Sequence, residues 1–229
     1  MVTRPELPLG LVAIPVRTRL IAPGDDVVGV ARDAVCAIAR PGDIIAISES
    51  AVAIAQGEFI PAEFVRPSKL AYALSRRAGA LATVNQPESL QLVIDEVGSA
   101  RVIWAAIAHV IGRLRGKRGV FYEVLGEAIT AIDGYTGTLP PFERAIVLAP
   151  REPDAFAQSV FEGTGIGCVV VDANDLEKTK VLGASVGVDR TCAERALLHN
   201  PHGNADEQTP IVVLKWRGLG PNPLVEAAL

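Results

Sequence analysis

The stretch Ile166-Gly167-Cys168-Val169-Val170-Val171-Asp172-Ala173-Asn174-Asp175 predicts a strand that is buried on both faces and ends in polar residues. A continuous apolar run rich in β-branched residues is typical of such a strand. The run stops at Asp172, so a carboxylate stands where the strand leaves its sheet. Because open α/β sheets bind ligands beyond the carboxyl ends of their strands, this edge of the sheet is the first candidate for a site.

A second polar cluster lies at residues 199–210 and leads into the apolar run Ile211-Val212-Val213-Leu214. It contains amide and carboxylate side chains at Asn204, Asp206, Glu207 and Gln208. We hypothesise that the two clusters meet in one site. The alternative is that both are ordinary turns, because Asx, Gly and Pro residues are the usual turn formers.

Apolar runs and helical periodicities alternate along the rest of the chain. Strands are expected at 9–16, 44–48, 101–111, 119–125, 144–149, 166–172 and 211–216, and helices at 25–39, 67–78, 85–98, 152–162 and 189–198. The 101–111 and 119–125 runs are expected to form a hairpin, and 48–57 a loop or a bent strand. The order strand, helix, strand over 144–172 fits a βαβ unit with a parallel pair. We therefore predict a mixed α/β fold with helices flanking mixed sheets, as one domain over 1–229 or two lobes.

The composition excludes several classes of protein. Hydrophobic residues make up 49% of the 229 residues, which indicates a globular chain, and the net charge of −4 gives no indication of nucleic-acid binding. The basic patch at 113–118 is short and is expected to be a turn. The apolar stretch 102–111 is too short to span a bilayer, so no membrane partner is expected.

The cysteines indicate the compartment. Cys36, Cys168 and Cys192 are far apart, with no C-x-x-C spacing. Cys36 and Cys168 lie in apolar runs and are expected to be buried. An odd number of cysteines without a secretory signal favours the cytoplasm.

Known catalytic motifs are missing. The sequence has no P-loop and no Gly-x-Ser-x-Gly elbow, and its glycine-rich stretch at 163–167 precedes a strand, which is the opposite of the dinucleotide-binding order. His199 and His202 lie three residues apart, but no thiolate or third histidine stands nearby to complete a zinc site.

The oxygen-bearing side chains favour another kind of metal. Carboxylates and amides are the ligands that magnesium and manganese prefer, often together with phosphates. Asp172 is the most informative residue, because a carboxylate leaving a buried strand is costly unless it is paired or metal-bound. The alternative is that Asp172 or Asn174 only caps a turn.

Several segments, in this order, resemble the gamma-glutamyl ligases that add glutamate to the precursor of coenzyme F-420. They are Ile14-Pro15-Val16, Leu20-Ile21, Gly24-Asp25-Asp26, 42–48, Ala55-Gln56-Gly57, Pro67-Ser68, Asp172-Ala173-Asn174, and Gly203 with Pro210 before 211–213. The resemblance implies a mixed α/β homodimer that uses GTP and two divalent ions, Mg²⁺ or Mn²⁺. In that family a carboxylate is activated as an acyl phosphate, and the amine of L-glutamate displaces the phosphate to form an amide.

The resemblance also implies site residues, position by position. Asp172 matches a metal-binding aspartate and is a catalytic candidate, as are Asn174 in the same segment and Glu207. The nucleotide would contact two loops and a third position. These residues are Arg17, Thr18, Arg19, Leu20, Glu49, Ser50 and Asn204.

The sequence departs from the family at several of these positions. Ile54 stands where the family has a lysine, and Asn204 stands where it has a metal-binding glutamate, with Asp206 and Glu207 just behind. A further metal aspartate of the family has no direct match, and Glu127 or Asp133 could replace it. The Asp-x-Asn segment continues as Asp175-Leu176 and not as Gly-Arg.

These observations leave three functions open. The first is a nucleotide- and metal-dependent ligase joining a small-molecule carboxylate to an amino acid. The second is a binding protein that keeps the fold without turnover, which the departure at Ile54 favours. The third is a transferase or hydrolase that uses the same acidic site.

Overall fold

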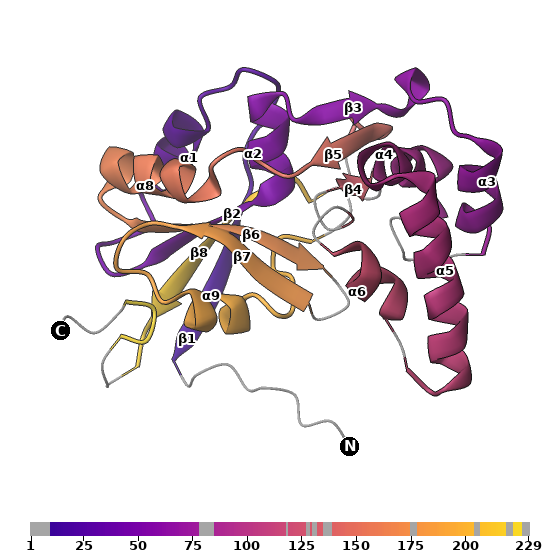
Figure 1. Cartoon of the computed structure of the whole chain (residues 1–229). Helices are drawn as coiled ribbons and strands as arrows, with labels where there is room; N and C mark the ends of the chain where they lie inside the picture. The colour runs from indigo at the N-terminus through magenta and orange to yellow at the C-terminus, as the bar shows by residue number, and fades with distance from the viewer. Residues whose placement is uncertain are drawn as a thin grey trace. The chain divides into compact units, whose positions relative to one another are not determined.

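A computed structural model of the chain describes residues 10–77, 85–117, 119–126, 129, 132–134, 139–174, 178–203, 207–218 and 222–225. The chain forms two compact units, drawn in Figure 1. Unit 1 contains Met1–Glu58 and Pro150–Leu229, and unit 2 contains Phe59–Ala149. The predicted mixed α/β class is confirmed, with a mixed sheet in unit 1 and an antiparallel sheet in unit 2.

A five-stranded sheet forms the centre of unit 1, in the order β1-β8-β2-β6-β7. Its strands are β1 (Leu11–Val16), β2 (Ile44–Ser48), β6 (Gly167–Asn174), β7 (Lys178–Ala184) and β8 (Ile211–Trp216). Strands β2 and β6 are parallel, and the other neighbours are antiparallel. The carboxyl ends of β1, β2 and β6 therefore lie at the same edge as the amino ends of β7 and β8.

Residues 167–174 of the opening stretch form β6, and the prediction that this strand is buried on both faces is confirmed. Cys168 and Val170 pack with helices α1 (Val27–Val35), α2 (Glu49–Gln56) and α8 (Pro153–Thr164). Val169 and Val171 pack on the opposite face with α9 (Arg190–Ala196). Figure 1 shows α9 on the side of the sheet opposite α1, α2 and α8. Burying one such aliphatic side chain contributes roughly 1.5–3 kcal/mol, so both layers of helices depend on this strand.

Short acidic side chains cap the N-termini of two helices in unit 1. The Asp26 carboxylate accepts a hydrogen bond from the backbone N–H of Gly29 at 3.0 Å, and Asp189 accepts one from Cys192 at 2.8 Å. Such caps satisfy N–H groups that the first turn of a helix leaves unpaired. Asp26 is thus the N-cap of α1.

Unit 2 has its own small sheet, in the order β3-β5-β4, and its own core. The strands are β3 (Phe59–Pro61), β4 (Ile132–Gly134) and β5 (Ala145–Leu148), and the helices are η1 (Ala62–Phe64), α3 (Lys69–Ser75), α4 (Pro87–Val97), α5 (Ser99–Leu114) and α6 (Val120–Leu125). The predicted helices at 67–78 and 85–98 are therefore confirmed, and Ser68 caps α3 through a hydrogen bond from Ala71.

The predicted hairpin at 101–125 is wrong, because both runs are helical. The side chains of α5 that face the core recur at helical spacing, at Val102, Ala105 and Gly112. The other face of α5 is also apolar, so the helical period was hidden in a continuous apolar run. A side chain at Gly112 would collide with Val120, so this glycine lets α6 approach α5 closely.

The stretch 48–57 is also helical, which corrects the prediction of a loop or a bent strand. Helix α2 is buried along most of its length, including Ala51–Ile54, so it has no polar stripe to mark it as a helix. It ends at Gly57, whose φ of 75° suits glycine.

Two further predictions need correction, and one strand was missed. Strand β5 pairs with β3 and β4 in unit 2, so the parallel partner of β6 is β2, and 144–172 forms no βαβ unit. Strand β7 was not predicted, because Lys178–Lys180 reads as polar. Cys168 is buried as expected, but Cys36 is exposed, since it lies just beyond the packed part of α1.

Among the described residues, no single helix is long and apolar enough to cross a membrane. The consecutive helices α4 and α5 reach that length and hydropathy only as a pair, and they are bent by 115°.

Candidate functional site

The register of the sheet in unit 1 gathers the predicted site segments at one edge. Val16, the last residue of β1, is paired with Ile211, and Ile211 is also paired with Ile47 of β2. Ser48 is in turn paired with Val171 of β6. The segments that follow β1, β2 and β6, and the segment that precedes β8, therefore leave the sheet on the same side.

Backbone hydrogen bonds hold three of these segments together. The N–H of Thr18 donates to the carbonyl of Gln208 at 3.1 Å, and the N–H of Ser48 donates to the carbonyl of Pro210 at 2.9 Å. The Arg17 guanidinium also lies 3.4 Å from Gln208 Oε1. Residues 207–210 are thus held between the loop after β1 and the start of α2.

Asp172 lies where β6 leaves this edge. It is the register partner of Lys180 on β7, and alternation along β6 places it on the same face as Val170, which α2 covers. Burial raises the pKa of Asp172, and the charge of Lys180 opposes this shift. A carboxylate whose ionised form is disfavoured by burial gains most from a bound cation.

Glu49 and Ser50 form the first turn of α2, directly after β2. Glu49 is buried, and a carboxylate in the first turn complements the helix dipole. The Ser48 side chain makes no capping hydrogen bond. The N-terminus of α2 therefore presents backbone N–H groups toward the same edge.

Arg19 and Leu20 contribute differently from Arg17 and Thr18. Arg19 Nη1 donates to Asp25 Oδ2 at 2.6 Å and to the carbonyl of Leu20 at 3.1 Å. The hydrogen bonds from Arg19 and from the N–H of Ala22 lower the pKa of Asp25. Arg19 thus fixes the turn before α1, whereas Arg17 reaches toward residue 208.

His202 has a role in this region that the sequence did not indicate. Its Nδ1 lies 3.1 Å from the carbonyl oxygen of Thr209, and the Thr209 hydroxyl donates to the carbonyl of His202. A carbonyl only accepts, so Nδ1 carries the proton and Nε2 has a lone pair. Among the described residues no group donates to Nε2, and burial lowers the pKa of His202 to about 4.

His202 therefore stays neutral at pH 7, and its two hydrogen bonds with Thr209 hold the 207–210 segment in place. The sequence suggested only a weak zinc ligand at this position. The contact with Thr209 arises from the path of the loop, so no local motif could have revealed it.

Glu207 lies against Gly203. A side chain added at Gly203, whose φ is +76°, would come within 2.6–2.9 Å of the Glu207 carboxylate. Asn174 is the last residue of β6, and Asp133 lies in β4 of unit 2, but their side chains are outside the described part of the chain. Asn204, Asp206 and Glu127 also lie outside the described residues.

The chemistry of the described donors fits a divalent cation. Asp172 at the edge is a partly buried carboxylate whose pKa is raised by burial, and carboxylate oxygens suit Mg²⁺ or Mn²⁺. Within the described ranges, no group of three His, Cys, Asp or Glu side chains is close enough to hold a metal. Three predicted ligands, Glu127, Asp133 and Asp206, have side chains outside those ranges.

Ile54 is the residue that stands where the family has a lysine. Ile54 is buried in α2, so this position supplies packing and no charge. A nucleotide at this edge would need its positive charge from elsewhere, and Arg17 is the described arginine that reaches toward residue 208.

Comparison with known proteins identifies the family. The family model for F420-0:gamma-glutamyl ligase matches residues 15–202. The chain is also 26% identical over 235 residues to coenzyme F420:L-glutamate ligase of Methanopyrus kandleri, an alignment that covers 89% of this chain and 84% of that protein. The family match includes the end of β1, α2 and β6, which supply segments at the edge of the sheet. The chain therefore belongs to the F420-0:gamma-glutamyl ligase family and is an amide-forming ligase.

Proposed function

We propose that this protein is a nucleotide- and divalent-metal-dependent ligase that joins a small-molecule carboxylate to an amino acid such as L-glutamate. The observation that supports the proposal is the convergence of Arg17–Leu20, Glu49–Ser50, Asp172 and Glu207 at one edge of the sheet in unit 1. The name of the Methanopyrus kandleri protein supports the amino acid, and the family supports the amide-forming reaction.

The proposed reaction has two steps. A carboxylate oxygen of the substrate attacks the terminal phosphorus of GTP or another nucleoside triphosphate, and the nucleoside diphosphate leaves. The amine then attacks the acyl carbon, phosphate leaves with the bonding electrons of the C–O bond, and the amine proton passes to solvent. A divalent cation would neutralise the crowded anionic oxygens.

The site residues would have different roles in this reaction, according to the chemistry of their side chains. Carboxylates would hold Mg²⁺ or Mn²⁺, and the two loops with the N-terminus of α2 would contact the nucleotide. The proposed metal ligands are Asp172, Glu127, Asp133, Asp206 and Glu207. The proposed nucleotide contacts are Arg17, Thr18, Arg19, Leu20, Glu49, Ser50 and Asn204. Asn174 would orient the substrate beside Asp172.

The two units would act as one ligase domain, because the family match runs through both. We further propose that the active form is a homodimer. The partners would thus be small molecules and a second copy of the chain.

The test is thermal stability with GTP, ATP and GDP, each with and without Mn²⁺ or Mg²⁺. Binding to the folded state raises the melting temperature by mass action. We expect a metal-dependent rise with one nucleoside triphosphate, and its loss in Asp172→Asn. The matched control is Asp33→Asn, which changes an exposed aspartate on α1 and should keep the rise. A nucleotide response that survives in Asp172→Asn would contradict the site assignment.

A second function is favoured by one observation, the buried Ile54 at the expected lysine position. A binding protein that keeps the fold without turnover would show no metal-dependent response to any nucleotide. In that outcome, metabolites without phosphate become the next ligands to test.

A further inference from the structure

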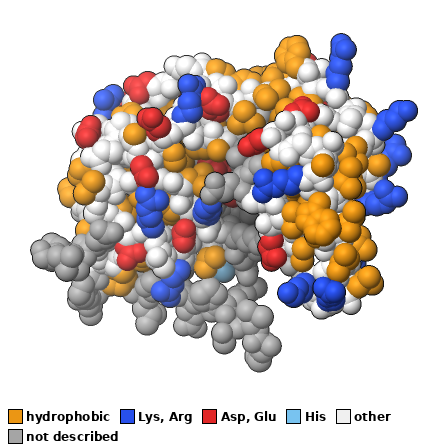
Figure 2. All heavy atoms as spheres, in the orientation of Figure 1, with side chains coloured by type: hydrophobic (Ala, Val, Ile, Leu, Met, Phe, Trp, Pro, Cys, Tyr) orange, Lys and Arg blue, Asp and Glu red, His pale blue; other side chains and the backbone are white. Residues whose placement is uncertain are grey.

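Unit 2 exposes an apolar surface on α5 that the proposed reaction does not use. The exposed fraction is 48% for Ile107, 58% for Val110 and 84% for Leu114. Trp104, on the same side of the helix, is 58% exposed. Figure 2 shows hydrophobic side chains gathered over α5, with Lys and Arg side chains at the margin. Exposed apolar patches of this kind mark interaction surfaces.

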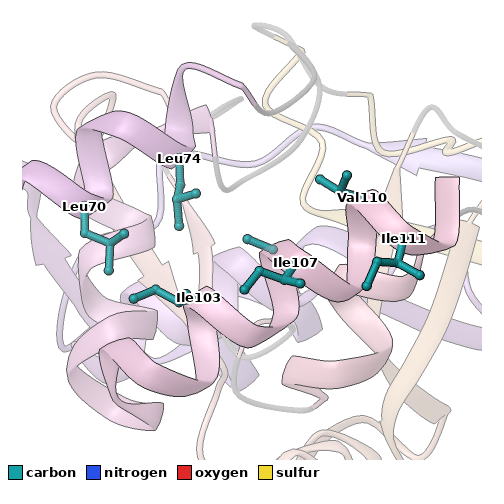
Figure 3. A pocket seen from close by; sticks show the side chains of 7 residues that line it. Leu70, Leu74, Ile103, Ile107, Val110 and Ile111 are labelled. Atoms are coloured by element: carbon teal, nitrogen blue, oxygen red, sulfur yellow. The ribbon is translucent and has the colours of Figure 1, made fainter. Parts of the chain in front are cut away.

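A groove between α3 and α5 forms part of this surface. It has a volume of about 400 Å³, and the side chains that line it are aliphatic. Figure 3 shows Leu70 and Leu74 of α3 pointing toward α5. Trp104 and Leu114 are exposed without lining the groove, so the apolar surface is wider than the groove itself.

Basic side chains flank the apolar face of α5 on both sides. Successive residues of a helix are about 100° apart, so Arg101 and Arg113 lie about 120° to either side of Ile107. Arg101 Nη2 donates a hydrogen bond to a backbone carbonyl of α6 at 3.1 Å. Arg115 and Lys117 follow directly after the helix, and all four basic side chains are exposed. The apolar face is therefore bordered by cations on its two flanks and at its C-terminal end.

The charges of this region have one sign. The stretches 64–87 and 97–122, which contain α3 and α5, hold nine Lys and Arg residues and no Asp or Glu. Within the described part of the chain, none of these basic side chains is paired with a carboxylate. The whole chain has a net charge of −4, so the two helices concentrate positive charge in a molecule that is acidic overall.

We propose that this face docks on the surface of an anionic lipid bilayer, with α5 lying in the plane of the headgroups. Helices that bind in this way carry Trp and aliphatic residues on one face and Lys or Arg beside it. The apolar side chains enter the boundary of the acyl region, and the basic side chains contact lipid phosphates. The short apolar stretch excludes a membrane span, which was the basis for expecting no membrane partner, but it leaves surface docking open. The inference goes beyond the ligase reaction and does not depend on it.

Two observations favour a lipid surface over a partner protein. A partner helix would occupy the groove, whose lining includes neither Trp104 nor Leu114, whereas a bilayer also takes up side chains on either side of it. Trp is enriched at the membrane–water interface, because its ring is apolar and its N–H is polar. The second observation is the absence of acidic residues from both stretches, which suits a surface of uniform negative charge.

The experiment is flotation of the full chain with vesicles of phosphatidylglycerol or of phosphatidylcholine. We expect the chain to float with the anionic vesicles and to stay in solution with phosphatidylcholine. High salt should release part of the bound chain, because ions screen the attraction between exposed charges. Equal binding to both lipids would contradict the charge argument, and no binding to phosphatidylglycerol would overturn the proposal.

Trp104 reports the docking directly. The chain has two Trp residues, and Trp216 lies in β8 of unit 1, so Trp216→Phe leaves Trp104 as the only tryptophan. Its emission should shift to shorter wavelength with phosphatidylglycerol vesicles, because the ring leaves water. An unshifted emission from a chain that floats would place the contact elsewhere and overturn the assignment to α5.

Substitutions on the apolar face test its contribution. Ile107→Glu and Leu114→Glu replace exposed aliphatic side chains, so the fold should tolerate them. Each should weaken binding to phosphatidylglycerol roughly tenfold or more, because an aliphatic side chain is lost from the acyl boundary. Val186→Glu is the matched control, because Val186 is 80% exposed in unit 1 and should keep wild-type binding. An equal loss in the control would contradict the assignment.

Substitutions of the flanking cations test the charge. Arg113→Gln and Arg115→Gln should each weaken binding to phosphatidylglycerol about fivefold, the contribution typical of one cation near an anionic surface. Arg32→Gln removes an exposed arginine of α1 in unit 1 and should have no effect. Unchanged binding in both α5 variants would contradict the role of the basic border.

Other occupants of this face would give different results. If the wild type fails to bind phosphatidylglycerol, binding of a synthetic acidic amphipathic helix that Ile107→Glu abolishes would assign the face to a partner protein. A mass in solution of two chains that Ile107→Glu halves would assign it to a second copy. Either result would contradict a lipid surface. The nucleotide-dependent thermal shift of the same variants reports the ligase site independently.

Discussion

Asp172 belongs both to the buried strand β6 and to the candidate site. Burial raises its pKa, so the folded state favours the neutral carboxyl and pays a penalty when the group ionises. This penalty is absent below the unfolded-state pKa of about 4 and grows as the pH rises through the folded-state value. Without metal or nucleotide, Asp172→Asn should therefore be more stable than the wild type at pH 7. Urea unfolding should show this gain shrinking as the pH falls toward about 4.

The exposed Asp33 is the control for this prediction, because Asp33→Asn should leave the urea midpoint unchanged at pH 7. A loss of stability in Asp172→Asn at pH 7 would mean that the ionised carboxylate is stabilised by a partner in the fold. That result would remove the physical argument for a cation at Asp172.

His202 should change the stability of the fold with pH in the opposite direction. Burial lowers its folded-state pKa to about 4, below the unfolded value of about 6.5, so the unfolded chain binds the extra proton in between. Stability should therefore fall as the pH falls from about 6.5 toward 4, by up to about 3 kcal/mol from this group. His202→Gln should flatten this part of the curve, as measured by urea unfolding at several pH values. A stability curve that keeps the wild-type slope in His202→Gln would contradict this account.

At the scale of the elements, β7 depends on a glycine at its contact with α8. A side chain at Gly183 would lie 2.1–2.5 Å from backbone atoms of Pro153 and Asp154. Backbone atoms cannot rotate away, so β7 and α8 would have to separate. Gly183→Ala should cost about 2–3 kcal/mol of stability. The comparison is Gly57→Ala, which meets no atom within 4 Å and should cost only about 1 kcal/mol for its left-handed backbone. Equal losses in urea unfolding would contradict this account.

The elements that the sequence predicted are those whose signals are local. Strand β6 has an unbroken apolar run, and α1 has a capping aspartate followed by one apolar stripe. The sequence misled where burial erased the pattern, as in α2 and α5, which are apolar on more than one face. It could not reveal the pairing of β6 with β2, because that pair joins residues more than a hundred positions apart.

The same distinction holds for the candidate site. The carboxyl end of β6 was predictable, since a carboxylate directly follows a buried strand. The hydrogen bonds of Thr18 and Ser48 to 208–210 were not, because they follow from the order of the strands. The hydrogen bond between His202 and the carbonyl of Thr209 could likewise not be predicted from the sequence.

At the scale of the whole molecule, unit 1 is assembled from two separate stretches of the chain, and unit 2 is inserted between them. Each core cluster lies within one unit, the two on the faces of the five-stranded sheet in unit 1 and the third in unit 2. A contact network joins the two stretches where unit 2 begins and ends. Arg151 pairs with Glu58 at 2.6 Å and exchanges hydrogen bonds with the side chain and backbone of Gln56.

Because these ends are held together inside unit 1, replacing residues 59–149 with a short glycine-rich linker should leave unit 1 able to fold. We expect cooperative urea unfolding and dispersed amide resonances, since all five strands of the sheet and both of its helical layers remain. The shortened chain should be inactive as a ligase, because the proposed metal ligands Glu127 and Asp133 are lost. An unfolded product would show that unit 2 is needed for the sheet to form. A folded product that keeps ligase activity would contradict the role proposed for Glu127 and Asp133.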